Sequence, residues 1–263
     1  MTNDADAALG RALALVRDLR ARCPWDQAQT PETLRPYLVE EALELDHAIG
    51  AGDVPHIKAE LGDLLLNLAF QVVIAEERGH FDVGDVVRGL EEKMWRRHPH
   101  LFGLGEKPKT WERAKREPRA MGPGITGSEQ HGTLSGLPPT LPRLLMAYRL
   151  QERAAGVGFD WPDAKGPAEK VREELGEVER EAGEGSGERL ESEIGDLLFA
   201  VVNLSRKLGV DPRSALEKAN AKFKTRFEAV EKLAGERGID LTGAGLEVLD
   251  RLWDEVKAQG QSL

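Results

Sequence analysis

Acidic residues at helical spacing occur twice in this chain, and each set could hold a hard divalent cation. In the first half, Glu41 and Glu44 stand three residues apart, as do Glu60 and Asp63. A constant offset of 133 residues (174 − 41 = 196 − 63 = 133) leads to a second set in the other half. That set consists of Glu174, Glu177, Glu193 and Asp196. Carboxylates three apart project from one side of a helix, and oxygen ligands favour Mg²⁺ or Mn²⁺. The repeat predicts two metal sites in a duplicated chain.

Two other interpretations of these carboxylates are open. Acidic residues on highly charged helices commonly form surface salt bridges, although the repeat at one offset favours the metal. A di-iron bundle would use Glu-x-x-His, and Glu44 with His47 fits that spacing, as does Glu77 with His80. The second half has arginine at both matching histidine positions, which disfavours iron.

Basic and aromatic residues downstream of the carboxylates fit a phosphate-bearing ligand. Lys222 and Arg226 stand four apart on one helical face, and Trp253 precedes Lys257 by the same spacing. Comparable pairs recur in the first half, at positions 93 and 97 and at positions 111 and 115. Lys and Arg can bind phosphate oxygens, and an aromatic ring can stack on a base. The alternative is that the cations are solvated and each tryptophan anchors a core or an interface.

The residues around the two acidic sets differ in charge. Lys170 and Arg189 in the second half correspond, at the same offset, to Tyr37 and His56 in the first. The second half therefore carries more permanent positive charge near its carboxylates. We expect it to be the half that acts on an anionic substrate.

The overall composition excludes several classes of protein. A formal net charge of −10 disfavours a general nucleic-acid binder, which needs a basic face against the phosphates. The apolar runs are too short to span a bilayer, and the acidic N-terminus does not resemble a signal peptide. Cys23 is the only cysteine, which is typical of a cytoplasmic protein without disulfides.

The apolar spacing and the Ala-, Leu- and Glu-rich composition predict an all-α fold, because no segment alternates as a strand would. The pattern predicts ten helices at Asp4–Ala21, Pro31–Ala48, Asp53–Arg78, Val83–Arg97, Thr110–Arg119, Leu141–Ala154, Pro167–Ala182, Ser186–Leu208, Asp211–Arg237 and Gly243–Gln259.

A segment rich in Gly and Pro separates the two halves. Residues 121–142 lack helical periodicity and are predicted to form a linker, or alternatively a long internal loop. The predicted domains are therefore 1–120 and 143–263, a tandem repeat of two helical bundles.

The chain resembles the two-domain members of the MazG family of nucleoside triphosphate pyrophosphohydrolases. Glu-Glu-x-x-Glu followed by Glu-x-x-Asp on two helices is the defining pattern of that family, and it is present twice. The segments 23–26, 97–100, 156–161 and 219–223 also look like those members. The resemblance implies an all-α fold, a homodimer, and Mg²⁺-dependent hydrolysis of nucleoside triphosphates to monophosphate and pyrophosphate.

The resemblance also implies roles for individual residues. Glu174, Glu177, Glu193 and Asp196 would bind Mg²⁺, with Glu41, Glu44, Glu60 and Asp63 as the matching first-half set. The residues that would hold the nucleotide are Lys170, Glu173, Arg189, Lys222, Arg226, Trp253 and Lys257. Lys222 and Arg226 would stabilise charge as water attacks the α-phosphorus, and Glu173 is one candidate to orient that water.

Other functions remain compatible with the sequence. The chain can be a narrower pyrophosphohydrolase for dUTP or phosphoribosyl-ATP, or a dimeric helical module that binds a partner without catalysis. Tandem length and the paired basic and aromatic residues favour broad hydrolysis of nucleoside triphosphates, including deoxynucleotides, as house-cleaning of the nucleotide pool.

Overall fold

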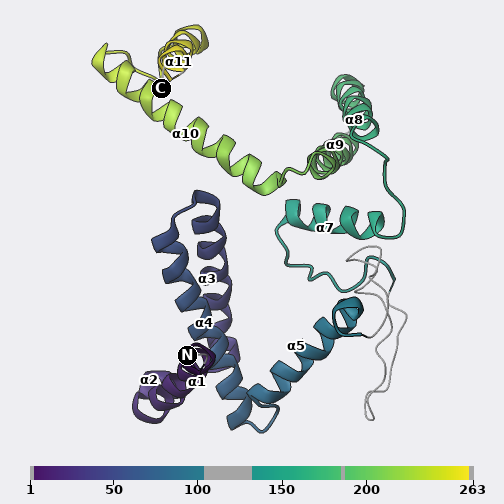
Figure 1. Cartoon of the computed structure of the whole chain (residues 1–263). Helices are drawn as coiled ribbons and strands as arrows, with labels where there is room; N and C mark the ends of the chain where they lie inside the picture. The colour runs from purple at the N-terminus through teal and green to yellow at the C-terminus, as the bar shows by residue number, and fades with distance from the viewer. Residues whose placement is uncertain (1–2, 104–131, 185–186, 261–263) are drawn as a thin grey trace. The chain divides into compact units, whose positions relative to one another are not determined.

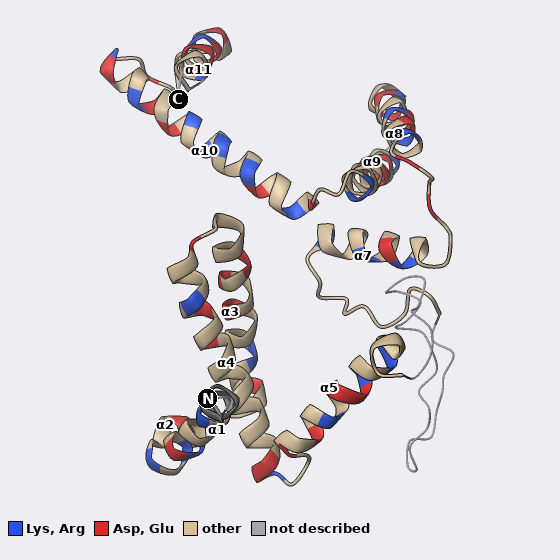
Figure 2. Ribbon diagram, in the orientation of Figure 1, with Lys and Arg blue, Asp and Glu red and all other residues tan. Residues whose placement is uncertain are grey.

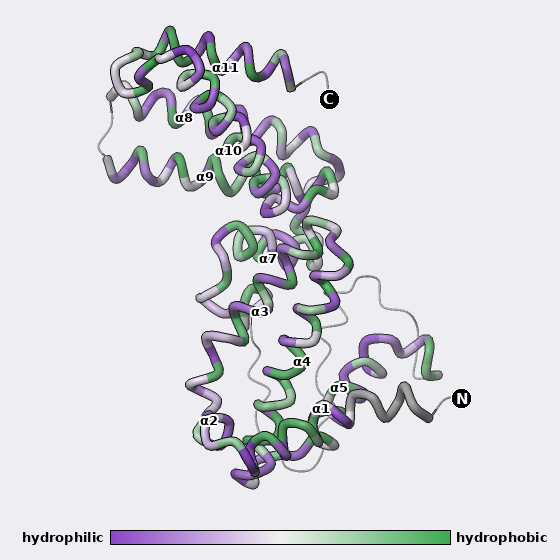
Figure 3. The backbone as a smooth tube through the Cα atoms, turned by 90° about the vertical axis from the view of Figure 1, so that its left-hand side faces the viewer, coloured by the Kyte–Doolittle hydropathy of each residue, from purple (hydrophilic) through white to green (hydrophobic). Residues whose placement is uncertain are grey.

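The computed structural model describes residues 3–103, 132–184 and 187–260. These residues form helices and turns without any strand, which confirms the predicted all-α class (Figure 1). The chain divides into two compact units, Met1–Lys109 and Thr110–Leu263. None of the described helices combines the length and the apolar character needed to cross a membrane. Figure 3 shows hydrophobic and hydrophilic residues alternating along the helices, as expected when each helix buries one face.

The first unit is built around two long helices that follow each other in sequence. Its elements are α1 (Asn3–Arg22), α2 (Pro24–Gln27), α3 (Pro31–Ala51), α4 (Val54–Glu77), α5 (Val83–Arg97) and the 3₁₀ turn η1 (Pro99–Leu101). Helices α3 and α4 lie side by side, and α1 packs on α4. The core contains Val16 from α1 together with Phe70, Val73 and Ile74 from α4.

Local sequence signals set the ends of this helix pair. Thr30 caps α3 by accepting a hydrogen bond from the Thr33 amide at 3.3 Å, and Pro31 occupies the first turn. The helix thus begins at the predicted residue. Gly52 ends α3 in the left-handed conformation, with φ of 70°, which glycine adopts without a steric penalty. Asp53 then caps α4 through the His56 amide at 3.2 Å. The chain reverses within these few residues, so α3 and α4 form a hairpin.

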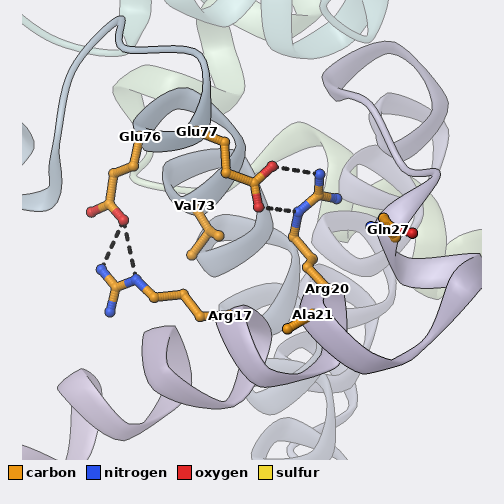
Figure 4. Close-up of a pocket in the computed structure, with 7 residues that line it drawn as sticks. All are labelled: Arg17, Arg20, Ala21, Gln27, Val73, Glu76 and Glu77. Atoms are coloured by element: carbon orange, nitrogen blue, oxygen red, sulfur yellow. Dashed lines mark hydrogen bonds and ion pairs between the residues drawn. The ribbon is translucent and has the colours of Figure 1, made fainter.

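A pair of arginines fastens α1 to the end of α4. Arg20 donates two hydrogen bonds to Glu77, at 2.7 and 2.8 Å (Figure 4). It also donates to the backbone carbonyls of Asp26, at 2.7 Å, and Gln29, at 3.1 Å. Arg17 forms a more exposed pair with Glu76 at 2.8 Å. These side chains line a pocket of about 360 Å³. Because its arginines already bind carboxylates, we interpret this pocket as a structural junction rather than an anion site.

The second unit repeats the hairpin and adds a separate helix pair. Its helices are α7 (Arg143–Ala155), α8 (Lys165–Glu184), α9 (Gly187–Lys207), α10 (Pro212–Glu236) and α11 (Leu246–Gly260). Helices α8 and α9 pack along each other, and α7 packs on α9, where Gln151 donates to the Phe199 carbonyl at 2.8 Å. Helices α10 and α11 share a small core of Val230, Ala234, Leu252 and Val256.

The segment that leads into α8 is held by charge and by close packing. Lys207 binds Asp160 at 3.2 Å and the Trp161 carbonyl at 2.6 Å, which ties this segment to the end of α9. The Trp161 ring lies so close to Gly166 that an added Cβ would stand 2.5 Å from Trp161 Cε3. A side chain in place of Gly166 would therefore have to displace the Trp161 ring.

Most predicted helices agree with the structure to within a few residues. The short α2 and η1 were not predicted, because a single turn is too short to show helical periodicity. The predicted helix Thr110–Arg119 lies outside the described residues, as do the first eleven residues of the predicted linker. The proposed domain limits of 1–120 and 143–263 therefore remain a prediction. The boundary between the two compact units falls between Lys109 and Thr110 in the sequence.

Candidate functional site: two carboxylate clusters

Each hairpin brings three glutamates together at the level of its acidic motifs. In the first unit one carboxylate oxygen from each of Glu41, Glu44 and Glu60 lies within 4.8 Å of the others. Glu41 and Glu44 come from α3, whereas Glu60 comes from α4, so the hairpin turn is what joins them. We refer to this set as the first cluster.

The second cluster has the same construction. It consists of Glu174 and Glu177 from α8 and Glu193 from α9, whose carboxylate oxygens also lie within 4.8 Å of one another. Glu174 is buried here, as Glu60 is in the first cluster. The aspartates that the sequence added to each set, Asp63 and Asp196, lie outside these groups of three, although both are close enough to act on them electrostatically.

Burial, and after it the crowding of negative charge, raises the pKa of one glutamate in each cluster. In the first cluster, burial followed by the charges of Asp63, Glu44 and Glu60 raises the pKa of Glu41. In the second cluster, burial followed by the charges of its acidic neighbours, first Glu177 and then Asp196, raises the pKa of Glu193. Both carboxyl groups therefore ionise at a higher pH than an ordinary glutamate. A bound cation would offset the repulsion between the neighbouring carboxylates.

Each cluster also contains a basic side chain one helical turn before one of its carboxylates. In the first cluster His56 Nε2 lies 3.1 Å from Glu60 Oε1, on α4. In the second cluster Lys170 Nζ lies 2.6 Å from Glu174 Oε1, on α8, and 2.9 Å from Glu173 Oε1. The hydrogen bonds to Glu174 and Glu173 raise the pKa of Lys170, which therefore stays charged.

These clusters have the donor set that a hard divalent cation requires. Three carboxylates converge from two helices, at least one of them is buried, and their mutual repulsion favours neutralisation by a cation. Mg²⁺ and Mn²⁺ bind oxygen ligands of this kind. The residues present therefore fit a metal in each unit.

Four of the nucleotide-binding candidates of the second half lie on helices other than α8 and α9. Lys222 and Arg226 are on α10, where Lys and Arg recur along the helix (Figure 2). Trp253 on α11 lies 5.3 Å from Phe223, measured between ring centroids, and packs beside the α10–α11 core. Lys257 lies 3.7 Å from Asp254. Among the described residues, no hydrogen bond or ion pair joins these side chains to the second cluster.

Arg189 is exposed near the start of α9, one turn before Glu193. Glu173 is exposed and binds Lys170. Sequence reasoning placed Lys170 and Glu173 with the substrate and did not foresee their contact with each other. It also missed the contacts of Lys170 with Glu174 and of His56 with Glu60. Both contacts could have been predicted from the sequence, because residues four apart on a helix are neighbours.

Comparison with known proteins agrees with this construction. The profile of the MazG nucleotide pyrophosphohydrolase domain matches residues 29–102 and 167–231, which contain the two hairpins and their clusters. The match covers both units, as expected of a duplicated chain. The chain belongs to the MazG family of nucleotide pyrophosphohydrolases, a family of enzymes.

Two relatives resemble the chain over most of its length. It is 41% identical over 252 residues to the nucleoside triphosphate pyrophosphohydrolase of Escherichia coli strain K12, which covers 93% of this chain and 94% of the relative. It is 46% identical over 237 residues to the nucleoside triphosphate pyrophosphohydrolase/pyrophosphatase MazG of Thermotoga maritima, with 89% of each chain covered.

Proposed function

We propose that this protein hydrolyses nucleoside triphosphates, including deoxynucleotides, to nucleoside monophosphate and pyrophosphate in a Mg²⁺-dependent reaction. The duplicated carboxylate hairpin, in a chain whose relatives are named for this activity, is the observation that carries the proposal. The resulting role is house-cleaning of the nucleotide pool in the cytoplasm. Mn²⁺ can replace Mg²⁺, because it accepts the same oxygen ligands.

Glu174, Glu177 and Glu193 would hold the metal, with Asp196 beside them. The metal supplies positive charge that neutralises the triphosphate and lowers the pKa of the attacking water. Glu173 precedes Glu174 in the sequence and shares Lys170 with it, and it is a candidate to orient that water. Attack at the α-phosphorus leaves pyrophosphate as the second product.

The second unit is proposed as the main catalytic one. Its cluster is accompanied by Lys170 and Arg189, whereas the first has Tyr37 and His56 at those places. Lys222 and Arg226 would bind phosphate oxygens, the arginine in bidentate fashion. Trp253 would contact the base, and Lys257 would also help to hold the nucleotide. The first cluster, with Glu41, Glu44, Glu60 and Asp63, is proposed as a metal site of lower activity.

A homodimer is proposed as the working assembly. The hairpins expose large apolar side chains, among them Leu43, Leu61 and Leu68 in the first unit and Ile194 and Leu198 in the second, each at least 43% exposed. Exposed apolar surface of this kind is typical of interaction sites. Sedimentation of the full chain tests the dimer, and a monomer at micromolar concentration would contradict it.

Analysis of the products tests the reaction itself. The full chain is incubated with Mg²⁺ and each of a panel of nucleoside triphosphates, deoxynucleotides, dUTP and phosphoribosyl-ATP, and the products are separated. Monophosphate and pyrophosphate from several bases are expected. Diphosphate with orthophosphate would refute the proposal, turnover of dUTP or phosphoribosyl-ATP alone would make the enzyme a narrow one, and no turnover would favour a partner-binding module.

A further inference from the structure

In each cluster a basic side chain binds one of the carboxylates, but the two basic side chains differ in type. One lies on the first helix of its hairpin, and the other lies on the second helix of its hairpin. In the second cluster the partner is Lys170, on the same helix as Glu174. In the first cluster the position that matches Lys170 is Tyr37, which carries no charge at neutral pH, and the partner is His56 on the other helix. Within the part of the chain that the structure describes, the second cluster is therefore the one in which a lysine binds a buried carboxylate.

Lys170 binds a carboxylate that would also hold the metal ion. Its ammonium lies 2.6 Å from Glu174 Oε1, and the Glu174 side chain is only 6% exposed. A buried carboxylate is costly to ionise without a partner, so this contact keeps Glu174 charged and correctly placed before any metal binds. The same contact opposes the entry of a second cation, because two cations cannot both neutralise one carboxylate at short distance without repelling each other.

Lys170 is also able to leave Glu174. Its side chain is 42% exposed, and its second contact, to Glu173, is with an exposed carboxylate. A lysine on a flexible four-carbon chain can turn from one acceptor to another. A triphosphate placed beside the cluster would provide new anionic oxygens for the ammonium.

We propose that Lys170 is a positioning residue that couples the binding of the metal to the binding of the triphosphate in the second unit. Without substrate, its ammonium neutralises Glu174 and weakens metal binding. When metal and triphosphate bind together, the metal takes over Glu174 and Lys170 transfers to the phosphate oxygens. This inference rests on the proposed function, and it adds that Lys170 contributes to the coupling of the two ligands in the second unit, a contribution that the first unit lacks.

The coupling must be reciprocal. If the triphosphate strengthens metal binding by some factor, the metal strengthens triphosphate binding by the same factor. The metal also attracts the triphosphate directly, so the measure of Lys170 is the part of the coupling that disappears with its charge. Arg180 provides a matched control, since it binds Glu177 of the same cluster at 3.1 Å but is 73% exposed. An exposed pair of this kind competes weakly with a cation.

Calorimetric titration of the full chain tests the proposal. The first cluster is silenced by Glu41→Gln with Glu44→Gln, and this parent is titrated with Mg²⁺ alone, with a non-hydrolysable nucleoside triphosphate alone, and with each in the presence of the other. The same titrations are made after adding Lys170→Met or Arg180→Met. We expect Lys170→Met to tighten the binding of Mg²⁺ alone and to reduce the coupling by about fivefold or more, the range usual for linked sites. Arg180→Met should leave both quantities close to those of the parent.

An unchanged Mg²⁺ affinity in Lys170→Met, or an undiminished coupling, would overturn the proposal. A parent that binds neither Mg²⁺ nor the triphosphate would instead refute the proposed function, and the inference with it. The reverse variant provides a second test. With the second cluster silenced by Glu174→Gln and Glu177→Gln, Tyr37→Lys places an ammonium one turn before Glu41, and it should weaken the binding of Mg²⁺ alone to the first cluster. A first cluster indifferent to Tyr37→Lys would contradict the role assigned to a lysine at this position.

Discussion

The two hairpins of this protein share a construction and differ in what surrounds their carboxylates. Each joins two glutamates of one helix to a third on the next, and in each the burial of one helix face raises the pKa of a carboxyl group. In the first unit the raised pKa belongs to Glu41 on α3, and in the second it belongs to Glu193 on α9. In each unit the basic side chain lies on the helix that does not bear the carboxyl group with the raised pKa. It is His56 on α4 in the first unit and Lys170 on α8 in the second. A duplicated scaffold can thus keep its ligand geometry while the charge around each cluster changes.

The largest expected difference between the halves concerns catalysis. Glu177→Ala should lower the turnover of nucleoside triphosphates by at least about 100-fold, a loss that even mutation of an outer partner of a metal ligand can cause. Glu44→Ala, at the matching place in the first cluster, should lower it much less. Pyrophosphate release measures both. Equal losses would show that the two clusters contribute alike, and the reverse order would assign catalysis to the first unit.

The anchoring of α1 in the first unit should have the next largest effect. Arg20→Met removes hydrogen bonds to Glu77 and to two backbone carbonyls, and it should lower the free energy of unfolding by about 2 kcal/mol. Arg17→Met, at a more exposed pair, should cost less than about 1 kcal/mol. Urea denaturation of the wild type and of each variant measures these changes in the free energy of unfolding.

The Arg20 effect should also depend on pH. Arg20 lowers the pKa of Glu77, so the stabilisation is complete above the ordinary glutamate pKa and is lost as the pH falls through the folded value. The difference between wild type and Arg20→Met should therefore shrink in acid. A difference that grows in acid would show that the pair is not its source.

A smaller effect is expected at the start of α8, where Gly166 stands at the position that matches Thr33 in the first half. Gly166→Ala would place a methyl group against the Trp161 ring and should destabilise the second unit by about 1 kcal/mol. Gly176→Ala, in the same helix with open space around the added methyl group, should stabilise it by a similar amount. Thermal unfolding followed by tryptophan fluorescence distinguishes them. Equal shifts in the same direction would indicate that Trp161 moves away without cost.

The smallest expected effect is a dependence of stability on pH and metal that both units share. Because the pKa of Glu41 and of Glu193 is raised in the folded state, the unfolded chain loses these protons first as the pH rises. Stability in EDTA should then decline slightly as the pH rises from the ordinary glutamate pKa through the folded values. Mg²⁺ should reverse the decline, since it binds only the folded clusters. Melting temperatures with and without Mg²⁺ test this, and a Mg²⁺ response that survives Glu41→Gln with Glu193→Gln would place the metal elsewhere.

Much of this arrangement could be predicted from spacing along the chain. The three-residue spacing of Glu41 and Glu44 and the apolar periodicity are local signals. They predicted the helices Pro31–Ala48 and Asp53–Arg78 and the acidic side of the first of them. The offset of 133 residues gave the second copy. The single-turn helices α2 and η1 escaped prediction, because they are too short to show periodicity.

Distances between segments far apart in the sequence could not be predicted in the same way. Arg20 and Glu77 stand 57 residues apart, and nothing in their local sequence marks them as partners. The sequence also gave no reason to separate Asp63 and Asp196 from the three glutamates that converge in each unit.

The sequence by itself determined that the chain is helical, that it is duplicated, and which side of each helix bears the acidic residues, because the helical repeat fixes how spacing becomes direction. Only the tertiary structure decided which carboxylates are buried and which groups of three converge. Burial and electrostatic coupling depend on how two helices pack against each other, and the spacing within one helix does not specify that packing. The contact of Lys170 with Glu174 follows from their spacing on α8, whereas the burial of Glu174 depends on that packing.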